Sequence, residues 1–175
     1  MRTEDDNADR EFLALVQANQ PRLQRICRVY AWQPADQNDL YQEVLFQIWR
    51  GLPGLRTETH AHTWLYRVAL NTAISFARRH VTRGARQVSH DPVTLGAMAE
   101  ASQPGTPDVS AGPRADLHEA ISQLDHAEKA LVTLFLEDLS YEEIAAVMGL
   151  SVSHVGVRLH RAKKKLAGLM QGGRP

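Results

Sequence analysis

The 175-residue sequence predicts an all-α fold of two small helical domains joined by a flexible linker. Apolar residues recur every three or four positions in several segments, and this spacing gives a helix one apolar face. No segment shows sustained alternation of apolar and polar residues, so no sheet is expected. Residues 91–113 contain seven glycines and prolines. Such a segment buries too little apolar surface to offset its ordering entropy.

These observations divide the chain into an N-terminal domain over residues 1–87, a linker over 88–115 and a C-terminal domain over 116–175. No apolar run approaches the roughly 18 residues needed to cross a bilayer, so membrane insertion is not expected. The acidic start is unlike a secretory signal. The single cysteine, Cys27, excludes an intramolecular disulfide and fits a reducing cytoplasm. We expect it to be a buried, inert thiol.

Four helices are expected in the N-terminal domain. Pro21 suits the first turn of the second helix, Pro34 ends that helix or lies in the following turn, and Asp36 can cap the third. The expected helices run from about Asp6 to Ala18, from Pro21 to Tyr30, from Asp36 to the glycine-rich stop at residues 51–54, and from Thr63 to His80.

The C-terminal domain carries a helix-turn-helix pattern over residues 139–166. Ser140 and Glu143 have the spacing of a capping box, and Gly149 stands where a left-handed residue would end the first helix. Ser151 can cap the second helix, whose apolar face comprises Val155, Leu159, Ala162, Leu166 and Leu169.

Charge is distributed unevenly although the formal net charge is zero. Residues 151–175 contain six Lys or Arg and no acid, whereas residues 116–150 contain eight acids and one base. A basic second helix behind an acidic segment favours DNA binding. The alternative is an ordinary helical hairpin with a solvated basic end.

Two segments of the N-terminal domain have compositions that packing of a core alone does not require. Residues 39–49 mix acids with aromatics, which indicates either a protein-binding face or solvated surface beside core. Residues 60–90 hold five arginines, four histidines and no acid, with Trp64, Tyr66 and Asn71 interleaved. This mixture suits single-stranded DNA, because aromatics stack on bases and arginines follow phosphates. A buried tryptophan beside a solvated basic face is the alternative.

Three motifs occur in order: NDLYQEVLFQIW (residues 38–49), TWLYRVALNTA (63–73) and LSYEEIAAVMGLSVSHVGVRLHRAKKKL (139–166). With them the chain resembles a bacterial RNA polymerase sigma factor of the sigma-70 family, in its extracytoplasmic-function (ECF) group. The resemblance implies a cytoplasmic promoter-specificity subunit that has neither enzymatic activity nor a cofactor. The partners it implies are core RNA polymerase, promoter DNA and an anti-sigma factor.

The resemblance also assigns roles by position. Contact with the clamp of the large polymerase subunit falls to Asp39, Leu40, Gln42, Glu43, Phe46 and Trp49. Strand separation at the −10 element, with capture of an everted base, falls to His60, His62, Trp64, Tyr66, Arg67, Asn71, Arg78 and Arg79. Reading of the −35 element in the major groove falls to Ser151, Ser153, His154, Val157, Arg158, His160, Arg161 and Lys165.

The reading helix departs from the family pattern. The family commonly has Thr, Val, a basic residue and Ser where this chain has His154, Val155, Gly156 and Val157. Gly156 removes a basic contact and costs about 1 kcal/mol of helix stability relative to alanine. The −35 preference is therefore expected to differ. His60 and His62 have only Glu58 beside them, so no metal site is expected.

Two other classes of protein compete with this interpretation. A stand-alone helix-turn-helix regulator would bind duplex DNA as a dimer without polymerase, and it would leave the 39–49 and 64–71 surfaces without a role. An enzyme is disfavoured because the sequence has no phosphate-binding loop, nucleophile elbow or HExxH motif.

Overall fold

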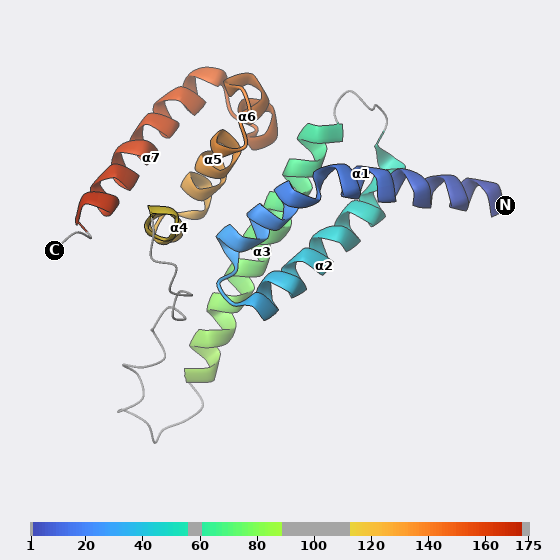
Figure 1. Ribbon diagram of the computed structural model, residues 1–175, viewed down its shortest axis with the longest axis horizontal. Helices are drawn as coiled ribbons and strands as arrows, with labels where there is room; N and C mark the ends of the chain where they lie inside the picture. Colours follow the sequence, from blue (N-terminus) through green and yellow to red (C-terminus); the bar gives the residue numbers. More distant parts are fainter. Residues whose placement is uncertain (1, 56–60, 89–112, 173–175) are drawn as a thin grey trace.

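The computed structural model describes residues 2–55, 61–88 and 113–172. In these ranges all regular structure is helical, which confirms the all-α prediction. The elements are α1 (Arg2–Tyr30), α2 (Pro34–Gly51), the 3-10 helix η1 (Leu52–Gly54), α3 (Ala61–Val88), α4 (Pro113–Ser122), α5 (His126–Leu136), α6 (Tyr141–Met148) and α7 (Val152–Gly172). Figure 1 shows α1–α3 gathered into one bundle, here the N-terminal half, and α4–α7 into a second, here the C-terminal half. Most of the linker expected over residues 88–115 lies outside the described residues.

The first helix corrects the prediction, because Pro21 does not start a new helix but lies inside α1. A proline in a helix interior removes one backbone hydrogen bond and costs about 3 kcal/mol. Leu15 and Leu23, on either side of Pro21, lie on one apolar face, and Leu23 is fully buried. The packing of this continuous face against α2 and α3 offsets the local cost.

The next two helices also differ from the prediction at their ends. Pro34 occupies the first turn of α2 behind the N-cap residue Gln33, so Asp36 lies within the first turn and does not cap it. Proline fits this position because the first turn needs no backbone donor there. Helix α3 extends over residues 61–88, beyond the expected 63–80, and no proline interrupts this range.

The helix-turn-helix prediction is confirmed in detail. Ser140 Oγ accepts a hydrogen bond from the Glu143 amide (3.2 Å), and Glu143 Oε2 accepts one from the Ser140 amide (2.7 Å). Gly149 ends α6 at φ 67° and ψ 35°, the left-handed region that glycine enters without strain. A second capping box, Asp125 with Glu128, starts α5.

One hydrophobic core runs through both halves of the molecule. It joins Leu23, Ile26, Leu40, Val44, Ile48, Leu65 and Ala69 of the N-terminal half with Ala130, Leu131, Leu134, Ile144, Ala145 and Val147 of the C-terminal half. A smaller cluster of Ala120, Ile121, Leu124, Val132, Leu159, Ala162 and Leu166 holds α4, α5 and α7 together. Cys27 is buried as expected, and desolvation raises the pKa of its thiol to about 12.

The two halves meet along two lines of contact. Helix α3 packs against α6, and α1 packs against α4 and α5. Helix α7 packs on α4, α5 and α6, on the side of the C-terminal half away from α1–α3 (Figure 1). The exposed side of α7 is therefore not covered by the N-terminal half.

Candidate functional site

Helix α7 has one buried and one exposed face. Val155, Leu159 and Ala162 are fully buried against the other C-terminal helices. The opposite face presents Ser153, His154, Val157, Arg158, His160 and Arg161, all exposed. A basic, polar helix face that stands clear of its own bundle has the shape and charge to enter the major groove of DNA.

The two ends of this expected reading surface are already engaged. Ser151 Oγ accepts a hydrogen bond from the His154 amide (3.4 Å) and lies 3.1 Å from Ser153 Oγ, so this hydroxyl caps α7. Lys165 Nζ donates to Glu128 Oε2 at 2.7 Å. This hydrogen bond raises the pKa of the exposed Lys165. The central residues of the exposed face are thus better placed than Ser151 and Lys165 to contact bases.

Gly156 lies in the first turns of α7, on the side that faces Tyr141 of α6. A Cβ atom there would meet only the ring of Tyr141, at an ordinary contact distance of 3.7 Å. Gly156→Ala is therefore expected to raise the free energy of unfolding by about 0.5–1 kcal/mol, because alanine loses less backbone entropy in a helix. Urea unfolding followed by circular dichroism measures this change. A loss of stability would show that the ring cannot accept a methyl group.

Helix α2 exposes a mixed aromatic and acidic surface. The side chains of Phe46 and Trp49 are 54% and 52% exposed, and their ring centroids lie 6.4 Å apart. Gln42 and Asp39 are exposed one and two turns before Phe46 on the same face. Large exposed aromatics on a rigid helix are typical anchors of protein–protein contacts. Leu40 differs, because it is fully buried in the core and offers no surface to a partner.

Two residues predicted to have separate roles form a pair. One nitrogen of Arg79, Nη2, lies 2.7 Å from both carboxylate oxygens of Glu43, so α3 is joined to α2 by an ion pair. The pair is partly exposed to solvent. The family resemblance assigned Glu43 to polymerase contact and Arg79 to the −10 surface. In this arrangement each neutralises the other.

The two aromatics of the α3 motif are held by packing. Trp64 is half-buried, and its ring lies so close to Gly51 that a Cβ on Gly51 would come within 2.8 Å of Trp64 Cζ2. Tyr66 is only 2% exposed, and desolvation raises its pKa to about 12. The Tyr66 ring is therefore not available to stack on a base in this arrangement, whereas Trp64 is held against the end of α2 and keeps part of its surface exposed.

The remaining α3 residues of the expected −10 surface vary in accessibility. Asn71, Arg78 and His62 are exposed. His60 lies outside the described residues. Asn71 therefore keeps the accessibility that base recognition by its amide requires.

Arg67 is exposed but donates its hydrogen bonds to the other half of the molecule. Its guanidinium donates to the carbonyls of Ala146 (2.5 Å) and Val147 (3.4 Å), in the last turn of α6. The last carbonyls of a helix have no partner within the helix and favour a cation. Helix α6 has no basic residue in its own last turn, so Arg67 supplies that charge.

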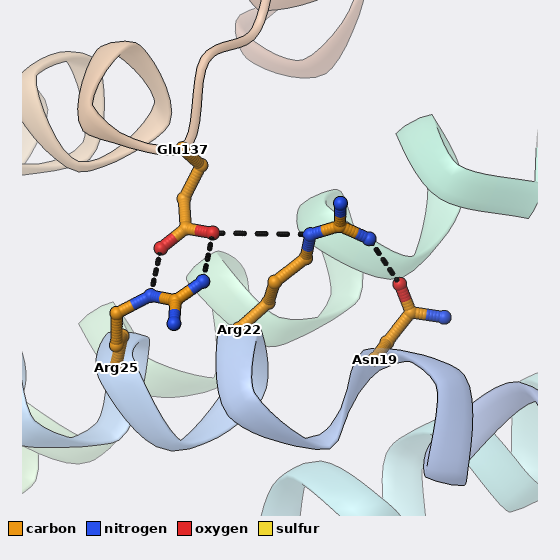
Figure 2. A network of polar contacts seen from close by, with 4 residues as sticks. All are labelled: Asn19, Arg22, Arg25 and Glu137. Carbon is orange, nitrogen blue, oxygen red and sulfur yellow. Dashed lines mark hydrogen bonds and ion pairs between the residues drawn. The ribbon is translucent and has the colours of Figure 1, made fainter.

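Sequence reasoning missed a cluster formed by Glu137 and α1. Figure 2 shows the Glu137 carboxylate, just after α5, facing Arg25 and Arg22 of α1. Arg25 donates to both carboxylate oxygens, with Nη2 2.5 Å from Oε2, and Arg22 Nε lies 3.9 Å from Oε2. The Glu137 side chain is 4% exposed, and its hydrogen bond raises the pKa of Arg25. The spacing of Arg22 and Arg25 places both on one helix face, the one signal that the sequence offered.

The described residues contain neither a candidate metal site nor a helix that could span a membrane. Among them, no group of three or more His, Cys, Asp or Glu side chains could hold a metal ion. No helix of the described residues is long and apolar enough to cross a membrane.

Comparison with protein families gives two matches that together span most of the chain. Residues 15–83 match the model of Sigma-70 region 2, and residues 114–166 match that of Sigma-70, region 4. The first match covers all of α2, most of α3 and the second half of α1, and the second covers α5, α6, nearly all of α4 and most of α7.

Two curated relatives are similar over most of their length. The chain is 33% identical over 145 residues to the ECF RNA polymerase sigma-E factor of Escherichia coli (strain K12), covering 78% of this chain and 74% of that protein. It is 30% identical over 172 residues to the RNA polymerase sigma-H factor of Pseudomonas aeruginosa, covering 93% and 87%.

Two solved structures share the fold. One is CnrH in complex with the cytosolic domain of CnrY, with a TM-score of 0.65, 24% identity and coverage of 95% of this chain and 91% of that one. The other is the sigma factor RpoE in complex with the anti-sigma factor NepR from Bartonella quintana, with a TM-score of 0.64, 20% identity and coverage of 95% and 98%. At this level of identity the two structures support the fold alone.

Proposed function

Since the chain belongs to the sigma-70 family of RNA polymerase sigma factors, in its ECF group, it acts in transcription initiation, and we propose how its surfaces divide that work. The N-terminal half binds core polymerase and opens the −10 element. The C-terminal half reads the −35 element. The chain performs no chemistry of its own, because the polymerase makes the RNA.

The observation that carries this division is the exposure of two opposite kinds of surface. Helix α7 presents a basic, polar face to solvent, and α2 presents Phe46 and Trp49. The first surface suits the phosphates and base edges of a duplex, and the second suits a protein. A stand-alone regulator would need only the first, so this alternative is not favoured.

The polymerase contact falls to Asp39, Gln42, Glu43, Phe46 and Trp49, with Leu40 holding α2 in place from inside. The −35 contact falls to Ser153, His154, Val157, Arg158, His160 and Arg161. Since Gly156 and Val157 offer no basic group, an apolar contact such as one to a thymine methyl replaces it. The −10 contact falls to Asn71, Arg67 and Arg78, with Trp64 and Tyr66 supporting the helix.

The cellular setting follows from this assignment. The chain works in the cytoplasm, where the polymerase and the chromosome are. An anti-sigma factor is its expected inhibitor, in line with the related fold of RpoE, which was solved in complex with the anti-sigma factor NepR.

The direct test is run-off transcription on a genomic library by core polymerase, with and without the chain, followed by sequencing of the start sites. Start sites that depend on the chain and share two short elements would support the proposal. A library transcribed equally in both reactions would rule it out.

Asn71→Ala is expected to slow formation of the open complex by about tenfold or more while polymerase binding stays unchanged. An everted base costs a few kcal/mol of lost stacking, and the amide of Asn71 would offset part of that cost. Permanganate reactivity of unpaired thymines measures strand opening, and fluorescence anisotropy measures polymerase binding. Ser75→Ala, one turn further along α3 and also exposed, serves as the control. Equal losses in opening and binding would contradict the assignment.

A further inference from the structure

We propose that Val157 reads the 5-methyl group of a pyrimidine in the −35 element, so that one position of this element is recognised by its methyl group and not by its base. The proposal rests on the function proposed above and deepens it, since it names the chemical group that the α7 surface selects. Thymine carries this methyl group in the major groove, and so does 5-methylcytosine. A methylated cytosine at this position is therefore accepted in place of thymine.

Val157 lies at the centre of the exposed face of α7. Val155 and Leu159, two residues before and two residues after it, are fully buried. An α-helix turns by about 100° per residue, so the Val157 side chain points about 160° away from both of them. It is 53% exposed, more than any other large apolar residue in the described part of α7. Once α7 enters the major groove, a residue in this place faces the base edges.

The charges around Val157 are complementary to duplex DNA. Residues 151–175 contain no acid. Arg158 is next to Val157 in sequence, Arg161 and Lys164 follow it by one and two helical turns, and none of the three forms an ion pair with an acid among the residues that the structure describes. These cations are available to phosphates beside the groove. The partner that fits this apolar side chain is therefore a DNA duplex and not an apolar protein surface.

Valine can offer only methyl groups to a base. Its side chain has no hydrogen-bonding group, and its branched Cβ keeps it in one preferred rotamer in a helix, so little entropy is lost on contact. In the major groove, thymine presents the O4 acceptor and the C5 methyl group, whereas cytosine presents the N4 donor. Valine cannot distinguish O4 from N4, and it gains free energy only by burying the methyl group.

The surroundings of Val157 leave the same base without a hydrogen bond. On one side, Gly156 has no side chain, and the nearest group is the ring of Tyr141, 3.7 Å from where a Cβ atom would lie. On the other side, Arg158 points about 100° away, toward the wall of the groove. The polar residues one turn before and after Val157 are about 5–6 Å away, more than the roughly 3.4 Å between base pairs, so they reach neighbouring pairs.

The test uses holoenzyme formed from core polymerase and the full-length chain, on a promoter recovered by the run-off experiment. Each thymine of the −35 element is replaced in turn by deoxyuridine, which lacks only the 5-methyl group and keeps every hydrogen-bonding group. Fluorescence anisotropy in competition between labelled and unlabelled duplexes measures the affinity of the holoenzyme. At one thymine the replacement should weaken binding about three- to fivefold, the usual effect of burying one methyl group.

Cytosine and 5-methylcytosine separate the methyl group from the base. Cytosine at the sensitive position, paired with guanine, should weaken binding at least as much as deoxyuridine does. 5-Methylcytosine in its place should recover about three- to fivefold in affinity. Equal affinities for the two cytosines would overturn the proposal, and so would a −35 element in which no thymine responds to deoxyuridine.

Val157→Ser tests whether this side chain makes the contact. Serine removes both methyl groups and has a helix propensity similar to that of valine, so the fold is kept. With this variant, thymine and deoxyuridine should be bound equally well. Val152→Ser is the matched control, because Val152 is 41% exposed on the same helix and points about 140° away from Val157. A deoxyuridine effect that survives Val157→Ser, or that Val152→Ser also removes, would contradict the assignment.

Failure of this assignment and failure of the proposed function give different results. If no start site depends on the chain, the proposed function is wrong and the reading of a methyl group falls with it. If start sites depend on the chain but no methyl group affects binding, the function stands and only the role of Val157 is wrong.

Discussion

Trp49→Ala is expected to weaken binding to core RNA polymerase by about 30-fold or more, and to leave the fold intact. Trp49 is half-exposed beside Phe46 and contributes little to the core. Truncation of an aromatic anchor at a protein interface costs about 2 kcal/mol or more, which corresponds to that loss of affinity. Fluorescence anisotropy of the labelled chain titrated with core polymerase measures the effect.

Leu13→Ala is the control for this experiment. Leu13 is an apolar residue of α1 with 53% exposure, similar to that of Trp49, and it lies outside the α2 surface. Its loss should leave the affinity nearly unchanged. Equal weakening by the two substitutions would show that apolar surface in general, and not the α2 face, decides binding.

Leu134→Ala is expected to lower the free energy of unfolding by about 3 kcal/mol, since truncation of a buried leucine removes apolar contacts and leaves a cavity. Leu134 is fully buried in the core shared by the two halves. For a chain of this size the midpoint of thermal unfolding should fall by about 6–12 °C. Circular dichroism during heating measures it.

Leu136→Ala, two residues along the same helix, provides the comparison. Leu136 is 52% exposed, so its truncation should change stability by no more than about 0.5 kcal/mol. Similar losses for Leu134→Ala and Leu136→Ala would contradict the burial of the Leu134 face of α5 in the core that both halves share.

The helix-turn-helix was predictable because its determinants are local. Ser140 and Glu143 form their capping box within one turn, and Gly149 takes the left-handed conformation that its position requires. The exposed face of α7 follows from helical periodicity alone. Such a pattern can be predicted from neighbouring residues alone, without knowing how distant parts of the chain pack.

Tertiary packing decided what the sequence did not reveal. Pro21 signals a helix start by local rules, but burial of a continuous apolar face keeps α1 intact. Leu40 and Tyr66 belong to surface-binding motifs by resemblance, yet both are buried. The contact of Glu137 with Arg25 spans 112 residues, and no spacing rule reaches that far.

The joints between α2 and α3 have a mechanical consequence. The Trp64 ring rests against Gly51 where α2 ends, and Arg79 grips Glu43 further along the pair. Because these two contacts join α2 and α3 at different points along their length, the two helices move as one unit. If α2 binds the polymerase and α3 opens the −10 element, as proposed, a shift of α2 on binding would carry α3 with it, and the geometry of one unit would fix where the DNA strands separate relative to the enzyme.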